Sequence, residues 1–206
     1  MTFPDQKYTS SDIFVDAYFD QYVMAAASVD REKVQDAINI LEKTYKTTGT
    51  LYVCGNGGSA SISNHLACDH GKLLSTGTEL LPHIQSLSTN VEVITAIAND
   101  ISYDDVFLLQ LKLIGKPGDV LMTVSSSGDS ENVVRAAIWA KENGMEVISL
   151  TGFDGGRTSN IAGVNIHVDA KNYGVVEDVH QSLMHLIGQY LRQAHMAETS
   201  IKKTLF

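Results

Sequence analysis

The sequence is poor in cysteine and in long apolar runs, and each shortage excludes a class of protein. Two cysteines among 206 residues, Cys54 and Cys68, cannot form a disulfide framework, so we expect reduced thiols in a cytoplasmic protein. No stretch approaches the roughly 18 uninterrupted apolar residues that a membrane helix needs. The first residues also lack the basic and apolar segments of a signal peptide. We therefore expect a protein with no membrane partner.

Positive charge is also scarce. The chain has 15 Lys and Arg against 24 Asp and Glu, which gives a formal net charge of −9. The basic residues are scattered, so the backbone of a nucleic acid would meet a repulsive field, and we expect no nucleic-acid partner. A small phosphorylated molecule is still compatible with this charge, because backbone N–H groups and hydroxyls can bind it locally.

A helical N-terminal segment precedes an alternation of strands and helices. Apolar residues recur at helical spacing through residues 10–47, which predicts two helices there. Continuous apolar strands separated by helices are typical of a parallel sheet that is covered on both faces. We therefore predict a single α/β domain over residues 1–206, with its α/β core at 50–196. Its predicted strands lie at 51–54, 84–87, 120–124, 147–150 and 164–168.

A loop rich in glycine, Cys54-Gly55-Asn56-Gly57-Gly58-Ser59, joins the first predicted strand to a helix. Glycines let the backbone approach a ligand closely, and the helix N-terminus presents unpaired N–H groups and a partial positive charge. The loop is neither a dinucleotide fingerprint nor a Walker loop, since it lacks the spacing of the first and the lysine of the second. A tight turn without a ligand is the alternative interpretation.

A second loop, Ser125-Ser126-Ser127-Gly128-Asp129-Ser130, repeats this arrangement after another strand. Two such loops are unlikely to meet by chance at the carboxyl edge of one sheet, where ligands of open α/β sheets bind. We predict that they hold a phosphate group. A third glycine-rich segment, 151–156, has fewer donors, and we expect it to be a turn. The predicted ligand-binding residues of the two loops are Gly57, Gly58, Ser59, Ser125, Ser126, Ser127 and Ser130.

Two helices carry residues that could do chemistry. His65 and Asp69 are four residues apart and share a helix face, while Glu177 and His185 lie loosely on one stripe of the last helix. Two imidazoles and two carboxylates suit zinc or another divalent metal, or an acid–base pair that moves protons. A surface hydrogen bond between His65 and Asp69, and a buried core histidine at 185, are the alternatives.

Two further histidines are expected outside such a site. His180 lies about 140° around the helix from His185, so both are unlikely to face one site on one subunit. His70 follows Asp69 in the sequence, and we expect it to be solvated rather than catalytic.

These motifs together resemble the SIS (sugar isomerase) domain family and, within it, the short phosphoheptose isomerases. The resemblance runs from about residue 30 to about residue 192. It is carried by Cys-Gly-Asn-Gly-Gly-Ser at 54–59, His65, Asn99-Asp100, Gly118-Asp119-Val120-Leu121, the loop 125–130, Leu150-Thr151-Gly152 with Gly155-Gly156, and the helix of His180 and His185.

The resemblance implies a flavodoxin-like three-layer α/β/α sandwich with a parallel five-stranded sheet and an N-terminal helical extension. It also implies a homotetramer whose active sites lie between subunits. The implied reaction interconverts sedoheptulose 7-phosphate and D-glycero-D-manno-heptose 7-phosphate by proton transfer through an enediol. By motif position Asp69 is the base and His185 its partner acid or base. Asn56 and Asp100 match positions that contact the sugar, and Ser59 and the loop 125–130 match the phosphate-binding elements.

Members of the family that bind zinc have ligands at the positions of His65, Asp69, Glu177 and His185. Asp69 stands where the family usually has glutamate, which shortens the base by one methylene. Glu177 stands where glutamine is common, and its charge should strengthen binding of a divalent metal. The sequence thus predicts a zinc-assisted isomerase. A SIS-fold adaptor that binds a protein partner and catalyses nothing, and an isomerase of another ketose phosphate, remain the alternatives.

Overall fold

A parallel five-stranded sheet organises the computed structural model, which describes residues 2–206. The spatial order is β2-β1-β3-β4-β5, and every neighbouring pair is parallel. The order reverses at β1, because β2 and β3 lie on its two sides, and ligands bind at such switch points. The strands are β1 (Thr50–Cys54), β2 (His83–Ser86), β3 (Val120–Ser125), β4 (Glu146–Thr151) and β5 (Val164–His167).

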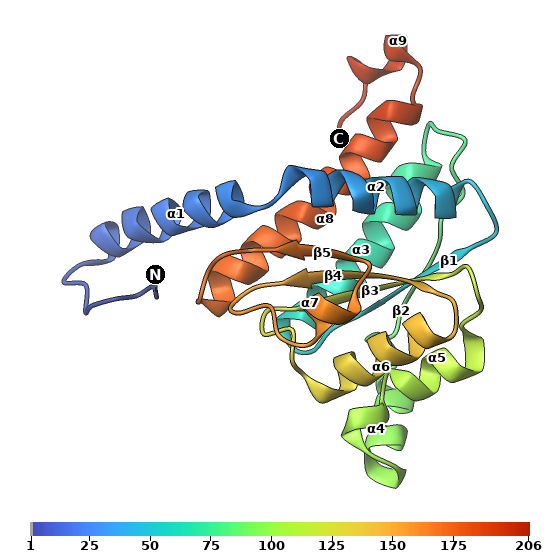
Figure 1. The fold of residues 1–206 in the computed structure, drawn as a ribbon. Coiled ribbons are helices and arrows are strands. Elements are labelled where there is room, and N and C mark those ends of the chain that lie inside the picture. The colour runs from blue at the N-terminus through green and yellow to red at the C-terminus, as the bar shows by residue number, and fades with distance from the viewer. Residues whose placement is uncertain (1) are drawn as a thin grey trace.

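Apolar cores on both faces of the sheet confirm the predicted three-layer fold (Figure 1). Side chains alternate along β1, so Leu51 and Val53 join one core while Tyr52 and Cys54 join the other. The first core also packs α2 (Arg31–Tyr45), α3 (Gly58–Ser75) and α8 (Tyr173–His195). The second includes residues of α4 (Val91–Asp100), α5 (Leu108–Ile114) and α6 (Glu131–Glu142). Short helices complete the described chain: η1 (Tyr103–Asp105), α7 (Thr158–Ile161) and α9 (Glu198–Ile201).

The first helix, α1 (Ser11–Ser28), projects from the body of the molecule beside α8 (Figure 1). Two tyrosines hold it there: the Tyr18 hydroxyl donates to Asp178 Oδ2 at 2.6 Å, and the Tyr22 hydroxyl lies 2.7 Å from Ser182 Oγ. Large apolar residues are exposed along this helix, namely Ile13, Phe14, Val15, Phe19, Val23 and Met24. Within residues 2–206, no helix has the length and apolar character needed to span a membrane.

Close packing of α3 on α8 overturns the prediction that His70 is solvated. The His70 side chain is buried; its Nδ1 accepts from the Tyr45 hydroxyl at 3.0 Å, and its Nε2 donates to the Met184 carbonyl at 2.9 Å. Burial lowers the pKa of His70, so the ring is neutral and carries one proton. A Cβ at Gly188 would lie 2.9 Å from His70 Cδ2, so glycine permits this approach. The prediction was wrong because both partners of His70 are distant in the sequence.

Candidate active site

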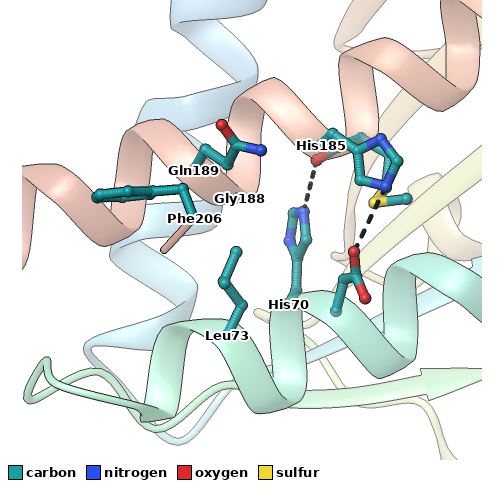
Figure 2. A pocket seen from close by; sticks show the side chains of 8 residues that line it. His70, Leu73, His185, Gly188, Gln189 and Phe206 are labelled. Atoms are coloured by element: carbon teal, nitrogen blue, oxygen red, sulfur yellow. Dashed lines mark hydrogen bonds and ion pairs between the residues drawn. The ribbon is translucent and has the colours of Figure 1, made fainter. Parts of the chain in front are cut away.

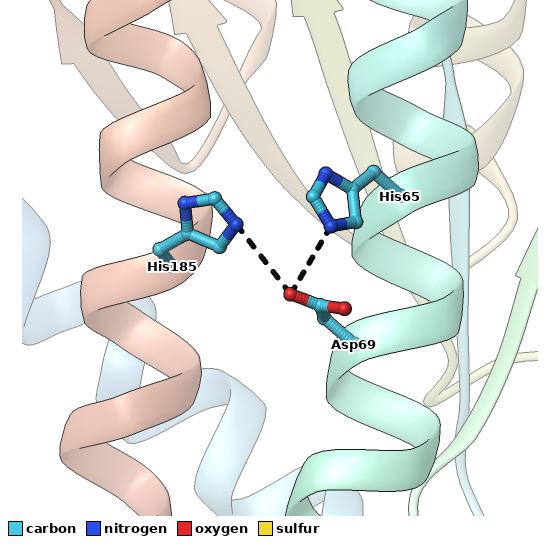
Figure 3. A group of neighbouring side chains, drawn as sticks. All are labelled: His65, Asp69 and His185. Atoms are coloured by element: carbon cyan, nitrogen blue, oxygen red, sulfur yellow. Dashed lines mark ion pairs between the residues drawn. The ribbon is translucent and has the colours of Figure 1, made fainter. Parts of the chain in front are cut away.

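Three residues with metal-ligating side chains converge between α3 and α8 (Figure 3). His65 and Asp69 lie one turn apart on α3, and His185 faces them from α8. Asp69 Oδ2 lies 3.3 Å from His65 Nε2 and 3.5 Å from His185 Nε2. One ligand atom of each residue falls within 4.8 Å of the others, and all three side chains are partly exposed. The structure therefore brings three of the predicted residues to one point that solvent can reach.

Gln181, one turn before His185, lies between the two imidazoles. Its Nε2 is 2.9 Å from His65 Nδ1 and 3.3 Å from His185 Nε2. His185 Nε2 thus faces an N–H donor of Gln181 and the carboxylate of Asp69, which require opposite protonation states of that nitrogen. The i, i+4 spacing from His185 was the available sequence signal, but this contact across two helices was not predicted.

The donor set of this group fits a divalent metal. Imidazole nitrogen and carboxylate oxygen are ordinary ligands of zinc, and three protein ligands with an open position are typical of catalytic zinc sites. A cation at this point could accept lone pairs from the two imidazole nitrogens and the carboxylate oxygen, which face one another. His65, Asp69 and His185 can therefore hold a divalent metal.

The two loops predicted to bind phosphate lie side by side at the carboxyl edge of the sheet. A Cβ at Gly55 would lie 2.7 Å from the Val124 carbonyl oxygen, so the loops approach as closely as glycine allows. Ser126 Oγ is buried and, among the described residues, has no hydrogen-bond partner, which leaves it available to a ligand. We call the hollow between the loops the serine pocket. It is lined by Asn56, Ser59, Val124, Ser125, Ser126, Ser127, Ser130, Tyr173 and Glu177.

Glu177 lies in the serine pocket and outside the His65, Asp69 and His185 group. Its carboxylate occupies the space that a Cβ at Gly58 would fill, so a larger residue at 58 would displace the Glu177 side chain. Burial raises the pKa of the Glu177 carboxyl, and the neighbouring charge of Asp178 raises it further. Along α8, Glu177 is two turns from His185, about 12 Å by the helical rise. Its role as a fourth metal ligand stays a prediction.

The two residues expected to contact the sugar differ in their surroundings. Asn56 and Asn132 exchange side-chain hydrogen bonds of 2.9 and 3.0 Å, and the Tyr103 hydroxyl donates to Asn56 Oδ1 at 2.9 Å. These contacts fix the amide and leave one N–H of Asn56 for a ligand. Asp100 is exposed at the end of α4 and accepts from the Asn99 amide at 2.7 Å. Asn132 and Tyr103 were not predicted.

The third glycine-rich segment forms a turn behind the serine pocket, as expected. Gly152 N–H donates to the Ser126 carbonyl at 3.0 Å, and Thr158 N–H donates to the Gly128 carbonyl at 2.9 Å. His180 is buried on the same side, with Nε2 3.2 Å from the Thr151 carbonyl oxygen, and so faces away from the site. Burial lowers its pKa to about 4.

A second pocket adjoins the His65, Asp69 and His185 group (Figure 2). It lies between α3 and α8, and Phe206 lines its far side. The Arg192 guanidinium stacks over the Phe206 ring at 5.2 Å, and its Nη1 donates to the Leu205 carbonyl at 3.1 Å. Asp69 and His185 thus border a hollow that the C-terminal segment helps to enclose.

Comparison with known proteins shows that most of this chain is similar to phosphoheptose isomerases. Residues 17–152 match the SIS domain family. The chain is 34% identical over 160 residues to phosphoheptose isomerase of Helicobacter pylori, covering 76% of this chain and 81% of that protein. It is 36% identical over 156 residues to that of Clostridium acetobutylicum, covering 76% and 79%. A solved phosphoheptose isomerase of Neisseria gonorrhoeae has a TM-score of 0.81 at 30% identity, covering 89% of this chain and 100% of that one.

Proposed function

We propose that this chain, which belongs to the SIS domain family, interconverts sedoheptulose 7-phosphate and D-glycero-D-manno-heptose 7-phosphate. One observation carries the proposal: α3 and α8 each contribute both to the serine pocket and to the His65, Asp69 and His185 group. Ser59 and Asp69 lie about 15 Å apart along α3 by the helical rise. This spacing favours a long sugar phosphate with its phosphate at the serines and its carbonyl end near Asp69.

The proposed reaction assigns one role to each end of the site. The hydroxyls of Ser59 and of the loop 125–130, with the helix N-termini behind them, bind the phosphate. Asp69 directs Oδ2 at the two imidazoles and its other oxygen away from them (Figure 3). We assign to this second oxygen the proton that moves between C1 and C2 through an enediol. His185 exchanges a proton with the sugar oxygens, and acid–base catalysis of this kind contributes about 10²–10⁴-fold.

We further propose zinc as the resident metal, held by His65, Asp69 and His185. Glu177 is the proposed fourth ligand, and it would have to turn away from the serine pocket to serve. A bound divalent metal would polarise a sugar carbonyl as a Lewis acid. The extra charge of Glu177, where the family commonly has glutamine, favours a metal once the carboxylate reaches it.

A homotetramer in the cytoplasm completes the proposal. The apolar residues exposed on α1 give it a surface that another subunit could cover, and the partly exposed metal group suits a site completed between subunits. Both cysteines are free thiols, which is consistent with the reducing environment of the cytoplasm. Burial raises the pKa of the Cys54 thiol to about 12, so this thiol is unreactive.

Turnover of a series of sugar phosphates, together with metal analysis of untagged protein, tests the proposal. Sedoheptulose 7-phosphate should have the highest kcat/KM, above fructose 6-phosphate and ribulose 5-phosphate, and we expect about one zinc per subunit. A higher kcat/KM for a shorter ketose phosphate would refute the proposed substrate. Absence of both metal and turnover with every sugar phosphate would contradict the enzyme assignment and favour the adaptor.

A further inference from the structure

The serine pocket is surrounded by more negative than positive charge. No Lys or Arg lines it among the described residues, and Glu177 is a lining residue. Two further carboxylates, Asp129 and Glu131, flank Ser130 in the chain. A phosphate dianion would therefore meet the carboxylate of Glu177 and bind a loop that carries or adjoins two more carboxylates, and like charges repel.

Arg157, which follows the third glycine-rich segment, pairs with two of these three carboxylates. Its Nε donates to Asp129 Oδ1 at 2.5 Å, and its Nη1 donates to Glu131 Oε2 at 2.8 Å. Its Nη2 also donates to the Asp129 carbonyl at 3.0 Å, so the guanidinium contacts the backbone of the loop itself. The other carboxylate oxygen of Glu131 accepts from Arg135 Nε at 2.8 Å. The hydrogen bond from Arg157 lowers the pKa of the Asp129 carboxyl, so the pair stays ionised.

The backbone next to Arg157 is fixed to the same loop. Gly156 and Gly128 pack so closely that a Cβ on either would overlap the other segment. The hydrogen bond from Thr158 N–H to the Gly128 carbonyl lies immediately beyond Arg157. The guanidinium is therefore held in place relative to the serines, rather than being a free surface charge.

We propose that Arg157 is a positioning residue for the phosphate group. It offsets the charges of Asp129 and Glu131, which lie beside the serines whose hydroxyls would bind the phosphate. The inference rests on the proposed function of the serine pocket. Arg157 does not line the pocket, and exposed ion pairs contribute little to stability, so its effect should be seen in anion binding more than in folding.

Calorimetric titration of the full chain with inorganic phosphate tests this role. Arg157→Gln should weaken phosphate binding about three- to tenfold at low ionic strength, because Asp129 loses its partner and Glu131 keeps only Arg135. Arg157→Lys, which keeps the charge, should retain most of the affinity. Adding Asp129→Asn and Glu131→Gln to Arg157→Gln should restore it. Lys46→Gln is the matched control, since it breaks an exposed ion pair with Glu42 just before β1, at the opposite edge of the sheet.

The salt dependence of phosphate binding and the KM of the sugar phosphate distinguish an effect of charge from a change in the shape of the loop. The deficit of Arg157→Gln should shrink as salt rises, because the Debye length falls from about 10 Å at 0.1 M to about 3 Å at 1 M. The KM for sedoheptulose 7-phosphate should rise by a similar factor. Equal phosphate affinity in Arg157→Gln and the unaltered chain would overturn the inference alone. A loss of phosphate affinity that neither salt nor the added carboxylate substitutions reverse would also overturn it. Failure of the unaltered chain to bind phosphate would instead refute the proposed function of the pocket.

Discussion

Replacement of Asp69 by asparagine keeps the shape of the side chain and removes its charge. Asp69 Oδ2 lies 3.3 Å from His65 Nε2 and 3.5 Å from His185 Nε2. An amide oxygen at the same place can still accept a hydrogen bond, so the packing of α3 on α8 should persist. What disappears is the proton acceptor that the proposed reaction needs and the anionic ligand that a divalent metal prefers.

The expected losses of activity and of stability differ in size. A general base contributes about 10²–10⁴-fold, so kcat should fall at least about 100-fold, or about 2.7 kcal/mol of activation free energy. Ion pairs as exposed as this one contribute only about 0–1 kcal/mol to stability, and the free energy of unfolding should change by less than that. A large loss of activity with little loss of stability is the expected signature of Asp69→Asn.

The assay follows conversion of sedoheptulose 7-phosphate, with urea denaturation and bound metal measured on the same preparation. Asp154→Asn is the matched control, because Asp154 is highly exposed and pairs with Lys171 at 2.7 Å, outside the candidate site. The control should keep normal activity. A kcat of Asp69→Asn within tenfold of the unaltered chain would refute the role assigned to this carboxylate.

Three further substitutions test separate parts of the structure. Gly188→Ala should cost about 1–3 kcal/mol of stability and weaken metal binding, because the new Cβ meets the His70 ring. The control is Gly71→Ala, whose Cβ would meet nothing within 4 Å. Equal stability of the two variants would contradict the prediction. Glu177→Gln should tighten binding of inorganic phosphate, since it removes a like charge from the serine pocket, and should lower metal content less than Asp69→Asn does; weaker phosphate binding would argue against this placement. The pKa of His180 falls from 6.5 to about 4 on folding, so the unfolded chain binds more protons between these values. The free energy of unfolding should therefore fall as pH drops through this window, by up to about 3 kcal/mol from this group, and a pH profile of urea denaturation that His180→Gln does not flatten would contradict the assignment.

The sheet was predictable because local patterns determine it. The strands β1, β3 and β4 are mostly apolar runs, and β5 alternates apolar and polar residues. All five predicted strands match the structure to within one residue at each end. The carboxyl-edge loops follow from the same pattern, since parallel strands place their exits together. Helix α4 was not predicted, although its apolar residues recur at helical spacing and the Asn90 side chain caps its first turn.

The candidate site was predictable only in part. Helical spacing places His65 and Asp69 on one face, but the approach of His185 depends on how α8 packs against α3. Gln181 was not predicted as a neighbour of both histidines for the same reason, because its contact with His65 joins residues far apart in the chain. His70 was misassigned since its burial depends on two such distant partners. Spacing within one helix does not indicate contacts between helices.

Isomerisation of sedoheptulose 7-phosphate in D₂O tests the central claim most directly. Proton transfer through an enediol by a base that exchanges with solvent places deuterium at C2 of the aldose product, which nuclear magnetic resonance can measure. We predict deuterium at C2 with the unaltered chain and product formation at least about 100-fold slower with Asp69→Asn. Absence of turnover in the unaltered chain, or a product that carries no deuterium at C2, would contradict the account.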